Sequence, residues 1–197
     1  MDITSIITAL GTGYLLGSIP FGLVLVKLAG LGDIRQIGSG NIGTTNVLRT
    51  GRKDIAALTL LLDAAKAGIA GLVIAHFIGQ PFGFMAAGAA LFGHCYPIWL
   101  RFKGGKGVAT FFGALLCLVW PVGLGAALIW LGTAYLTRYS SLSALMAAIF
   151  APLAAYIFAP RAALYMCLFM TAIILWRHRE NIGRLLKGQE SKIGQKS

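Results

Sequence analysis

The chain has 197 residues, of which 57% are hydrophobic and only 12% charged, and its formal net charge is +11. This composition excludes an ordinary soluble globular domain and predicts a single all-α domain, residues 1–197, that crosses a membrane several times. The positive charge does not indicate a nucleic-acid partner, because the cations lie in short segments between apolar runs and form no basic face of a soluble domain.

The first apolar run, residues 3–28, predicts a membrane span that is interrupted at Pro20. The segment Met1-Asp2-Ile3 lacks the basic start of a signal peptide, so we interpret the run as a span and not as a cleaved leader. Within the run, Gly13 and Gly17 form a small-xxx-small pair, which lets a neighbouring helix approach closely.

A polar connection, residues 29–53, comes next and is about 25 residues long, whereas connections between helices usually have about 2–8. Arg49 offers a planar fork of donors that suits phosphate or carboxylate. We expect Thr44 or Thr45 to cap a short helix that ends near Gly51. The other polar candidates are Ser39, Asn41 and Asn46. The segment is therefore a candidate substrate site, and the alternative is a turn-rich connection with a cytoplasmic arginine.

The second predicted span, residues 54–77, contains Asp63 and Lys66 one turn apart on one face. A charge at mid-bilayer costs about 3 kcal/mol or more, so we expect a mutual ion pair that faces the bundle interior. The pair either braces the bundle or lies beneath a substrate cavity. Near the end of the third predicted span, residues 82–100, His94 is expected to make an interhelical hydrogen bond.

Three glycines surround one lysine in Gly104-Gly105-Lys106-Gly107, directly before an apolar run that predicts a helix from Val108. Glycine lets successive amides point into one concavity, and a helix N-terminus carries partial positive charge. Together with the lysine they predict a site for phosphate or another anion. The pattern is not a Walker A loop, because Leu100 and Gly107 stand where that motif needs Gly and Ser or Thr. The alternative is a Gly-rich turn with a lysine that faces the cytoplasm.

Four further spans are predicted at residues 108–119, 122–136, 142–158 and 162–176. We divide the 29 residues from Val108 to Leu136 into two spans near Trp120-Pro121. This division puts the cationic tail, which begins at Arg177, on the same side of the membrane as the first two loops, residues 29–53 and 101–107. All 17 Lys and Arg residues except Arg161 and Lys66 then lie on that side. We therefore predict seven spans in the cytoplasmic (inner) membrane, with the N-terminus outside and the C-terminus cytoplasmic.

In the tail, His178, Asn181 and Arg184 are spaced by three, so a continuing helix would place them on one side. His178 is the best candidate for proton transfer near neutral pH, although such a histidine is often a solvated bystander. Paired carboxylates, a G-x-S-x-G elbow and metal-ligand spacing are all missing, and Cys95, Cys117 and Cys167 lie far apart. We expect no metal and no cofactor.

Three segments, in this order and on one predicted side, resemble the acyl-phosphate-dependent glycerol-3-phosphate acyltransferase family of bacteria (PlsY). They are Ser39-Gly40-Asn41-Ile42-Gly43…Asn46…Arg49, Gly104-Gly105-Lys106-Gly107-Val108-Ala109-Thr110 and His178…Asn181-Ile182…Arg184-Leu185…Gly188…Glu190. The run Leu62-Asp63-Ala64-Ala65-Lys66 also fits, although Ala67 stands where the family pattern has glycine.

The resemblance implies transfer of a fatty acyl group from acyl phosphate to the 1-hydroxyl of sn-glycerol 3-phosphate, at an active site facing the cytoplasm. The products are lysophosphatidate and inorganic phosphate, in the first step of phospholipid synthesis. The implied partners are acyl phosphate, glycerol 3-phosphate and membrane lipids. A small transporter of an organic phosphate is the alternative, but such proteins usually have two repeated halves and this sequence has none.

The motifs suggest a division of roles within this reaction. The expected catalytic residues are Ser39, Arg49, Lys106, His178 and Asn181. The expected substrate- or phosphate-binding residues are Asn41, Thr44, Asn46, Gly104, Gly105, Gly107 and Arg184. Asp63, Lys66 and Glu190 are assigned to structure, with Glu190 pairing a cation of the motifs. The hydroxyl proton goes either to His178 or to a phosphate oxygen of the donor, and the second route is preferred.

Overall fold

The computed structural model describes residues 2–194, and every regular element in this part of the chain is helical, which confirms the all-α class. The α-helices are α1 (Ile3–Gly17), α2 (Phe21–Leu28), α3 (Thr44–Val47), α4 (Lys53–Phe77), α5 (Gln80–Cys95), α6 (Val108–Leu118), α7 (Trp120–Thr137), α8 (Ser140–Phe158), α9 (Arg161–Arg177) and α10 (Arg179–Leu186). Short 3₁₀ turns occupy Ile34–Gln36, Leu48–Thr50 and Ile98–Leu100.

Prolines explain where two helices end. The first apolar run divides into α1 and α2 at Pro20, which lacks the N–H that a continuous helix needs. α5 ends at Cys95, within the third predicted span of residues 82–100, and a 3₁₀ turn follows. Tyr96 leaves the helical region with φ −135° and ψ 57°, as expected for a residue before Pro97. The chain can therefore turn back at the end of α5. This turn positions the segment Gly104-Gly105-Lys106-Gly107, called the glycine–lysine loop below.

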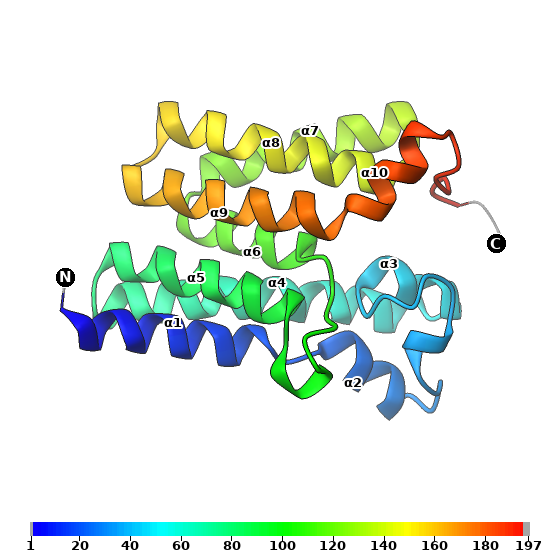
Figure 1. Cartoon of the computed structure of the whole chain (residues 1–197), viewed down its shortest axis with the longest axis horizontal. Coiled ribbons are helices and arrows are strands. Elements are labelled where there is room, and N and C mark those ends of the chain that lie inside the picture. The colour runs from blue at the N-terminus through cyan, green and yellow to red at the C-terminus, as the bar shows by residue number, and fades with distance from the viewer. Residues whose placement is uncertain (1, 195–197) are drawn as a thin grey trace.

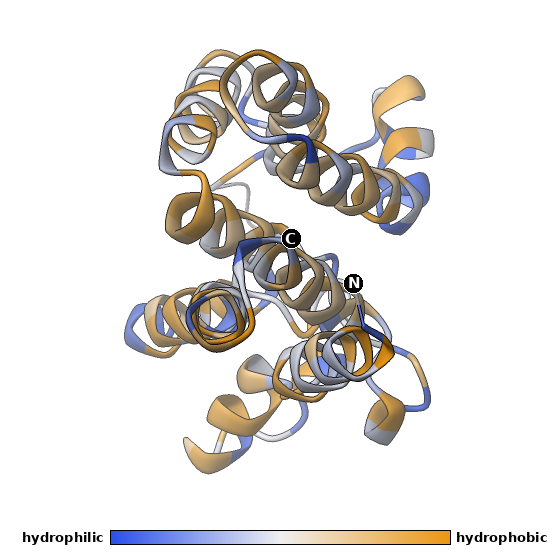
Figure 2. Cartoon of the chain, turned by 90° about the vertical axis from the view of Figure 1, so that its left-hand side faces the viewer, coloured by the Kyte–Doolittle hydropathy of each residue, from blue (hydrophilic) through white to orange (hydrophobic). Residues whose placement is uncertain are grey.

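The helices form two packed groups. α5 packs against α1 and α4, and α4 packs against α6, while α7, α8 and α9 form the second group. α6 connects the groups through α7, and α9 also contacts α5. Seen along the bundle, the two groups diverge and apolar residues dominate their helices (Figure 2). Figure 1 shows α2, α3 and α10 at one end of the bundle and the N-terminus at the other.

The close approach predicted at Gly13 and Gly17 is confirmed. A Cβ at Gly13 would collide with the backbone of Ala86, and a Cβ at Gly17 with the backbone of Ala90. α1 and α5 therefore pack backbone to backbone, as small residues allow in membrane bundles.

Four segments of residues 2–194 are long and apolar enough to cross a membrane: Ile3–Leu28, Lys53–Phe77, Trp120–Thr137 and Ser140–Phe158. α5 and α9 are slightly shorter, with 16 and 17 residues, and α6 has 11. The count of seven spans and the orientation of the termini stay predictions.

Candidate functional site

The glycine–lysine loop is fixed to the end of α5. The amide of Gly104 donates to the carbonyl of Cys95 (3.1 Å), and the amide of Gly105 donates to the carbonyl of His94 (3.0 Å). A Cβ at Gly105 would collide with Nε2 of His94, so only glycine lets the loop lie this close to α5. These two amides are already engaged and do not point into an open concavity.

The next amides are different. Gly107 is the N-cap of α6, with a φ of 82° that favours glycine, and the first bond of the helix runs from Phe111 N to Gly107 O. Among residues 2–194, no acceptor is found for the backbone amides from Lys106 to Thr110. Five successive unpaired donors at a helix N-terminus, beside a lysine, are the arrangement that holds an anion.

Lys106 starts a chain of polar contacts that leads into the tail. Its Nζ donates to Oδ1 of Asn181 (2.6 Å), whose Nδ2 donates to Oε1 of Glu190 (2.6 Å). Ser141 donates to the same oxygen, and Nε of Arg184 donates to Oε2 (2.6 Å each). Glu190 therefore forms an ion pair with Arg184, as predicted, and its hydrogen bond also orients Asn181.

Burial and hydrogen bonding shape the protonation of this chain. Burial and the charge of Arg184 hold the pKa of Lys106 below its ordinary value. Burial by itself would raise the pKa of Glu190, but hydrogen bonds from Ser141, Asn181 and Arg184 outweigh it and lower this pKa. The carboxylate thus stays ionised and keeps its three donors.

His178 lies at the junction of α9 and α10 and is only 3% exposed. Its Nδ1 lies 2.8 Å from the carbonyl oxygen of Ile174. A carbonyl only accepts, so Nδ1 carries the proton and Nε2 of the neutral ring has a free lone pair. Burial, with a contribution from the charge of Lys106, lowers the pKa of His178 to about 4. The ring is therefore neutral at pH 7 and is not a solvated bystander.

The first loop is organised around Asn46, which is 2% exposed. Its Nδ2 lies within 3.1 Å of the carbonyls of Ile34, Ile37 and Asn41, and its Oδ1 accepts from the amide of Ser39 (3.0 Å). Four backbone groups between residues 34 and 41 thus meet at one amide side chain.

α3 ends at Val47 and continues into a 3₁₀ turn that ends near Gly51 as predicted, but the predicted cap was wrong. Gly43 is the N-cap of α3 and offers no side chain, while Thr44 is already inside the helix. Oγ1 of Thr44 is buried with no partner among residues 2–194. Arg49 lies over Gly38, where a Cβ would meet its side chain. Oδ1 of Asn41 accepts from the amide of Gly43 (2.9 Å).

The predicted site residues thus form two clusters. One contains Lys106, His178, Asn181, Arg184 and Glu190, and the other contains Ser39, Asn41, Thr44, Asn46 and Arg49. In the part of the chain that the structure describes, no hydrogen bond or ion pair joins them, although α3 and α10 lie at the same end of the bundle (Figure 1). Leu100, just before the glycine–lysine loop, packs against the apolar core beneath the first loop.

The buried ion pair predicted in α4 is present. Nζ of Lys66 lies 2.8 Å from Oδ1 of Asp63, and it also contacts the carbonyl of Ile19 (3.1 Å) and Nδ1 of His94 (2.7 Å). His94 therefore makes the predicted interhelical hydrogen bond, between α5 and α4. Because its ring also lies against Gly105, the ion pair is directly beneath the loop.

Two polar residues of the site were not predicted. Ser141, at the start of α8, donates to Glu190, and Arg177 binds the glycine–lysine loop. Nothing in the sequence distinguishes Arg177 from Arg179 two residues later, and Ser141 lies in no motif. Within residues 2–194, no three His, Cys, Asp or Glu side chains gather into a set that would ligate a metal ion.

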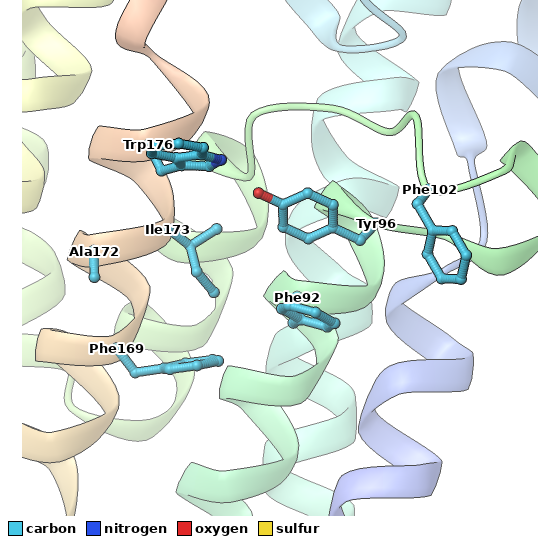
Figure 3. A pocket seen from close by; sticks show the side chains of 7 residues that line it. All are labelled: Phe92, Tyr96, Phe102, Phe169, Ala172, Ile173 and Trp176. Atoms are coloured by element: carbon cyan, nitrogen blue, oxygen red, sulfur yellow. The ribbon is translucent and has the colours of Figure 1, made fainter.

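Apolar side chains of α5 and α9 line a groove that starts close to the loop. One cavity of about 400 Å³ lies between Phe92, Tyr96 and Phe102 on one side and Phe169 and Trp176 on the other (Figure 3). A second cavity, of about 650 Å³, shares Phe92 and Phe169 with the first and continues along α1 and α5. The two form one apolar groove, which runs from the level of Tyr96 and Trp176 toward the opposite end of the bundle.

The chain resembles known proteins over nearly its whole length. A family profile described as "Glycerol-3-phosphate acyltransferase" matches residues 7–188. A glycerol-3-phosphate acyltransferase of Maricaulis maris is 58% identical over 196 residues, which cover 98% of this chain and 91% of that relative. One of Rhodopseudomonas palustris is 54% identical over 190 residues, covering 96% and 97%.

Two solved structures also match. Both are described as PlsY (YgiH), an integral membrane glycerol 3-phosphate acyltransferase, one in its glycerol 3-phosphate form and one in its lysophosphatidic acid form. They superpose with TM-scores of 0.90 and 0.89 at 40% and 39% sequence identity, and the alignments cover 96% of each chain.

Proposed function

The chain belongs to the glycerol-3-phosphate acyltransferase family, and we propose that it transfers a fatty acyl group from acyl phosphate to the 1-hydroxyl of sn-glycerol 3-phosphate. The products would be lysophosphatidate and inorganic phosphate, in phospholipid synthesis. Similarity to the two PlsY structures supports a membrane enzyme that takes glycerol 3-phosphate. The acyl phosphate donor rests on the resemblance of the motifs and on the anionic site described next.

The observation that carries the proposal is the set of donors at the start of α6. The unpaired amides from Lys106 to Thr110 and the Lys106 ammonium supply the partial and full positive charge that a phosphate dianion needs. In this assignment Gly107 gives the backbone its turn, while Gly104 and Gly105 act by anchoring the loop. Arg184 adds a second cation nearby.

The apolar groove would hold the fatty chain. Its near end lies at Tyr96 and Trp176, which directly adjoin the segments that fix the loop, so an acyl carbonyl at this end would lie close to the phosphate site. A long apolar chain gains free energy when it leaves water for such a groove.

The proton of the attacking hydroxyl has two routes. In both, a bond forms between the glycerol oxygen and the acyl carbon, the bond from that carbon to the phosphate oxygen breaks, and the phosphate leaves. Phosphate is a good leaving group, so strong activation of the hydroxyl is unnecessary. A base works best with a pKa near the operating pH, and the pKa of about 4 makes His178 a weak one. This favours a phosphate oxygen of the donor as acceptor of that proton, and Nε2 of His178 would then accept a hydrogen bond from the neighbouring 2-hydroxyl of the glycerol.

The first loop would complete the site from the same end of the bundle. Arg49 would hold the second phosphate, and Ser39, Asn41 and Thr44 would orient the glycerol hydroxyls or the acyl carbonyl, as would Asn181. Asn46 would not contact substrate but would hold the first loop in its conformation, because its side-chain amide is fully engaged by backbone groups of that loop. We place this site at the cytoplasmic face of the inner membrane, in a bundle of seven spans.

The proposal is tested with the purified protein in detergent, supplied with palmitoyl phosphate and glycerol 3-phosphate. We expect inorganic phosphate and lysophosphatidate in equal amounts, and no turnover when palmitoyl-CoA or a palmitoylated carrier protein replaces the acyl phosphate. Lys106→Met should abolish turnover, while Lys103→Met, an exposed neighbour, should not. Turnover with the thioesters alone would contradict the donor assignment, and labelled glycerol 3-phosphate accumulating in vesicles without acylation would indicate a transporter.

A further inference from the structure

Arg177, the last residue of α9, forms hydrogen bonds with the backbone of the loop that carries Lys106. Its Nε donates to the carbonyl of Gly105 (3.0 Å), and its Nη2 donates to the carbonyl of Gly104 (2.8 Å). The guanidinium also lies 5.3 Å from the centre of the Tyr96 ring, within the range of a cation–π interaction. Arg177 therefore touches both the loop and the end of α5.

Together with α5, this contact saturates the backbone before Lys106. The amides of Gly104 and Gly105 donate to the carbonyls of Cys95 and His94, and their carbonyls accept from Arg177. All four polar backbone groups of the two glycines are thus engaged. A loop without side chains would otherwise sample many conformations, because glycine restricts the backbone least.

The same turn of α9 also places the histidine of the site. His178 follows Arg177 directly, and its ring is held by the carbonyl of Ile174, one turn earlier. Asn181, on the next turn, receives the hydrogen bond from Lys106. The two hydrogen bonds from Arg177 to the glycine carbonyls therefore set the distance between the anion site of α6 and the polar side chains of the tail.

We propose that Arg177 is a positioning residue of the transferase: it fixes Lys106 and the unpaired amides of α6 relative to His178 and Asn181. The inference rests on the proposed role of this loop in holding phosphate. Two carbonyls one residue apart need two donors in a rigid plane, which a guanidinium provides and an ammonium does not. Arg177 acts through the backbone of the loop and does not have to touch either substrate.

Three variants test this: Arg177→Gln, Arg177→Lys and the control Arg179→Gln. Arg179 carries the same charge and is exposed, and within residues 2–194 its side-chain hydrogen bond and cation–π contact are both with Trp176 of its own turn. With palmitoyl phosphate and glycerol 3-phosphate, kcat/KM should fall about tenfold or more in Arg177→Gln, less in Arg177→Lys, and under about threefold in Arg179→Gln. The wild-type protein must turn over these substrates first, so failure of the proposed function is seen separately.

Hydrogen–deuterium exchange supplies the readout that does not depend on the reaction. Amides of the peptide covering residues 101–107 should exchange faster in Arg177→Gln, to an intermediate extent in Arg177→Lys, and at the wild-type rate in Arg179→Gln. A fall in kcat/KM with unchanged exchange would mean that the guanidinium binds substrate directly and would overturn the proposal, as would wild-type kinetics. If Arg177→Gln does not fold, Arg177→Lys carries the same comparison.

Discussion

His178 shows how local environment decides what a residue can do. In the sequence it is a titratable group with an ordinary pKa near 6.5. In the structure, burial keeps the ring neutral, although the hydrogen bond to Ile174 by itself would raise the pKa. That bond fixes the proton on Nδ1 and leaves Nε2 free. A folded-state pKa below the unfolded value means that the folded protein binds fewer protons, so this group destabilises the fold as the pH falls.

We therefore predict a loss of stability in acid that depends on His178. The free energy of unfolding should be unaffected by this group above about pH 6.5 and should fall between pH 6.5 and 4, by about 2 kcal/mol at pH 5. Thermal unfolding in detergent between pH 5 and 7.5 measures this. The wild-type midpoint should drop more steeply than that of His178→Gln, in which Glu190 and the other carboxylates still titrate. Parallel pH profiles for the two proteins would contradict the assignment.

A second prediction concerns Gly105. In Gly105→Ala the new Cβ meets Nε2 of His94, and this ring cannot move aside easily because Nδ1 contacts Lys66. The loop must shift and carry Lys106 with it, so kcat/KM should fall between about ten- and a hundredfold while the protein stays folded. Gly183→Ala is the matched control, because nothing lies within 4 Å of its Cβ. Equal activities of the two variants would show that the loop tolerates displacement.

Some of these contacts were predictable from the sequence and others were not. Spacing alone placed Asp63 one turn from Lys66, and the tail motif put Asn181 and Arg184 on one side. Arg177 and Ser141 were missed because they act on backbone or on a residue far along the chain, and neither contact leaves a spacing signal. The engagement of the Gly104 and Gly105 amides was also missed, since it depends on where α5 ends.

At the scale of elements, α4 and its partners show how a membrane bundle accommodates charge. Lys66 is neutralised by Asp63 on its own helix, and it also reaches the carbonyl of Ile19 in the break between α1 and α2. At the break this carbonyl has no donor four residues later; it accepts from the amide of Phe21 (3.1 Å) and from the lysine. Pro20 predicted the break, and the packed structure shows that Lys66 binds a carbonyl beside it.

This arrangement predicts unequal effects of single and double substitutions. Lys66→Met leaves Asp63 buried without its main partner and should destabilise the fold by about 3–5 kcal/mol. Replacing both residues, as Asp63→Leu with Lys66→Met, removes the buried charges together and should restore part of that loss. Thermal midpoints in detergent make the comparison, with the exposed Lys53→Met as control. A double variant less stable than either single one would show that the polar cluster is needed as a whole.

The whole molecule brings distant segments to one end of a bundle. The apolar runs predicted the helices, and the distribution of cations grouped the two loops with the tail. The structure has α2, α3 and α10 at a common end (Figure 1). The bounds at Cys95 and the divergence of two helical groups were beyond sequence patterns, because both depend on packing between segments.

The predicted orientation is testable with single cysteines in a background without Cys95, Cys117 and Cys167. Cysteines at the exposed positions Gln36, Lys103 and Gln189 should react with an impermeant reagent only after the membrane is opened, and one at Gln80 should react in intact cells. If Lys103 and Gln189 were labelled from opposite sides, the loop and the tail would not share a site and the enzyme would need another explanation.

The groove between α5 and α9 has a consequence for how such an enzyme meets its substrate. Several of its lining residues, such as Phe102, Tyr165 and Trp176, are more than half exposed, so the groove is open along the sides of the helices, and in the predicted orientation that side would face lipid. With a chain held there, the donor would enter and the lysophosphatidate would depart laterally within the leaflet, while only small ions cross the interface. Turnover would then follow the mole fraction of donor among the surrounding amphiphiles, and diluting the micelle with inert detergent would slow the reaction at constant bulk concentration.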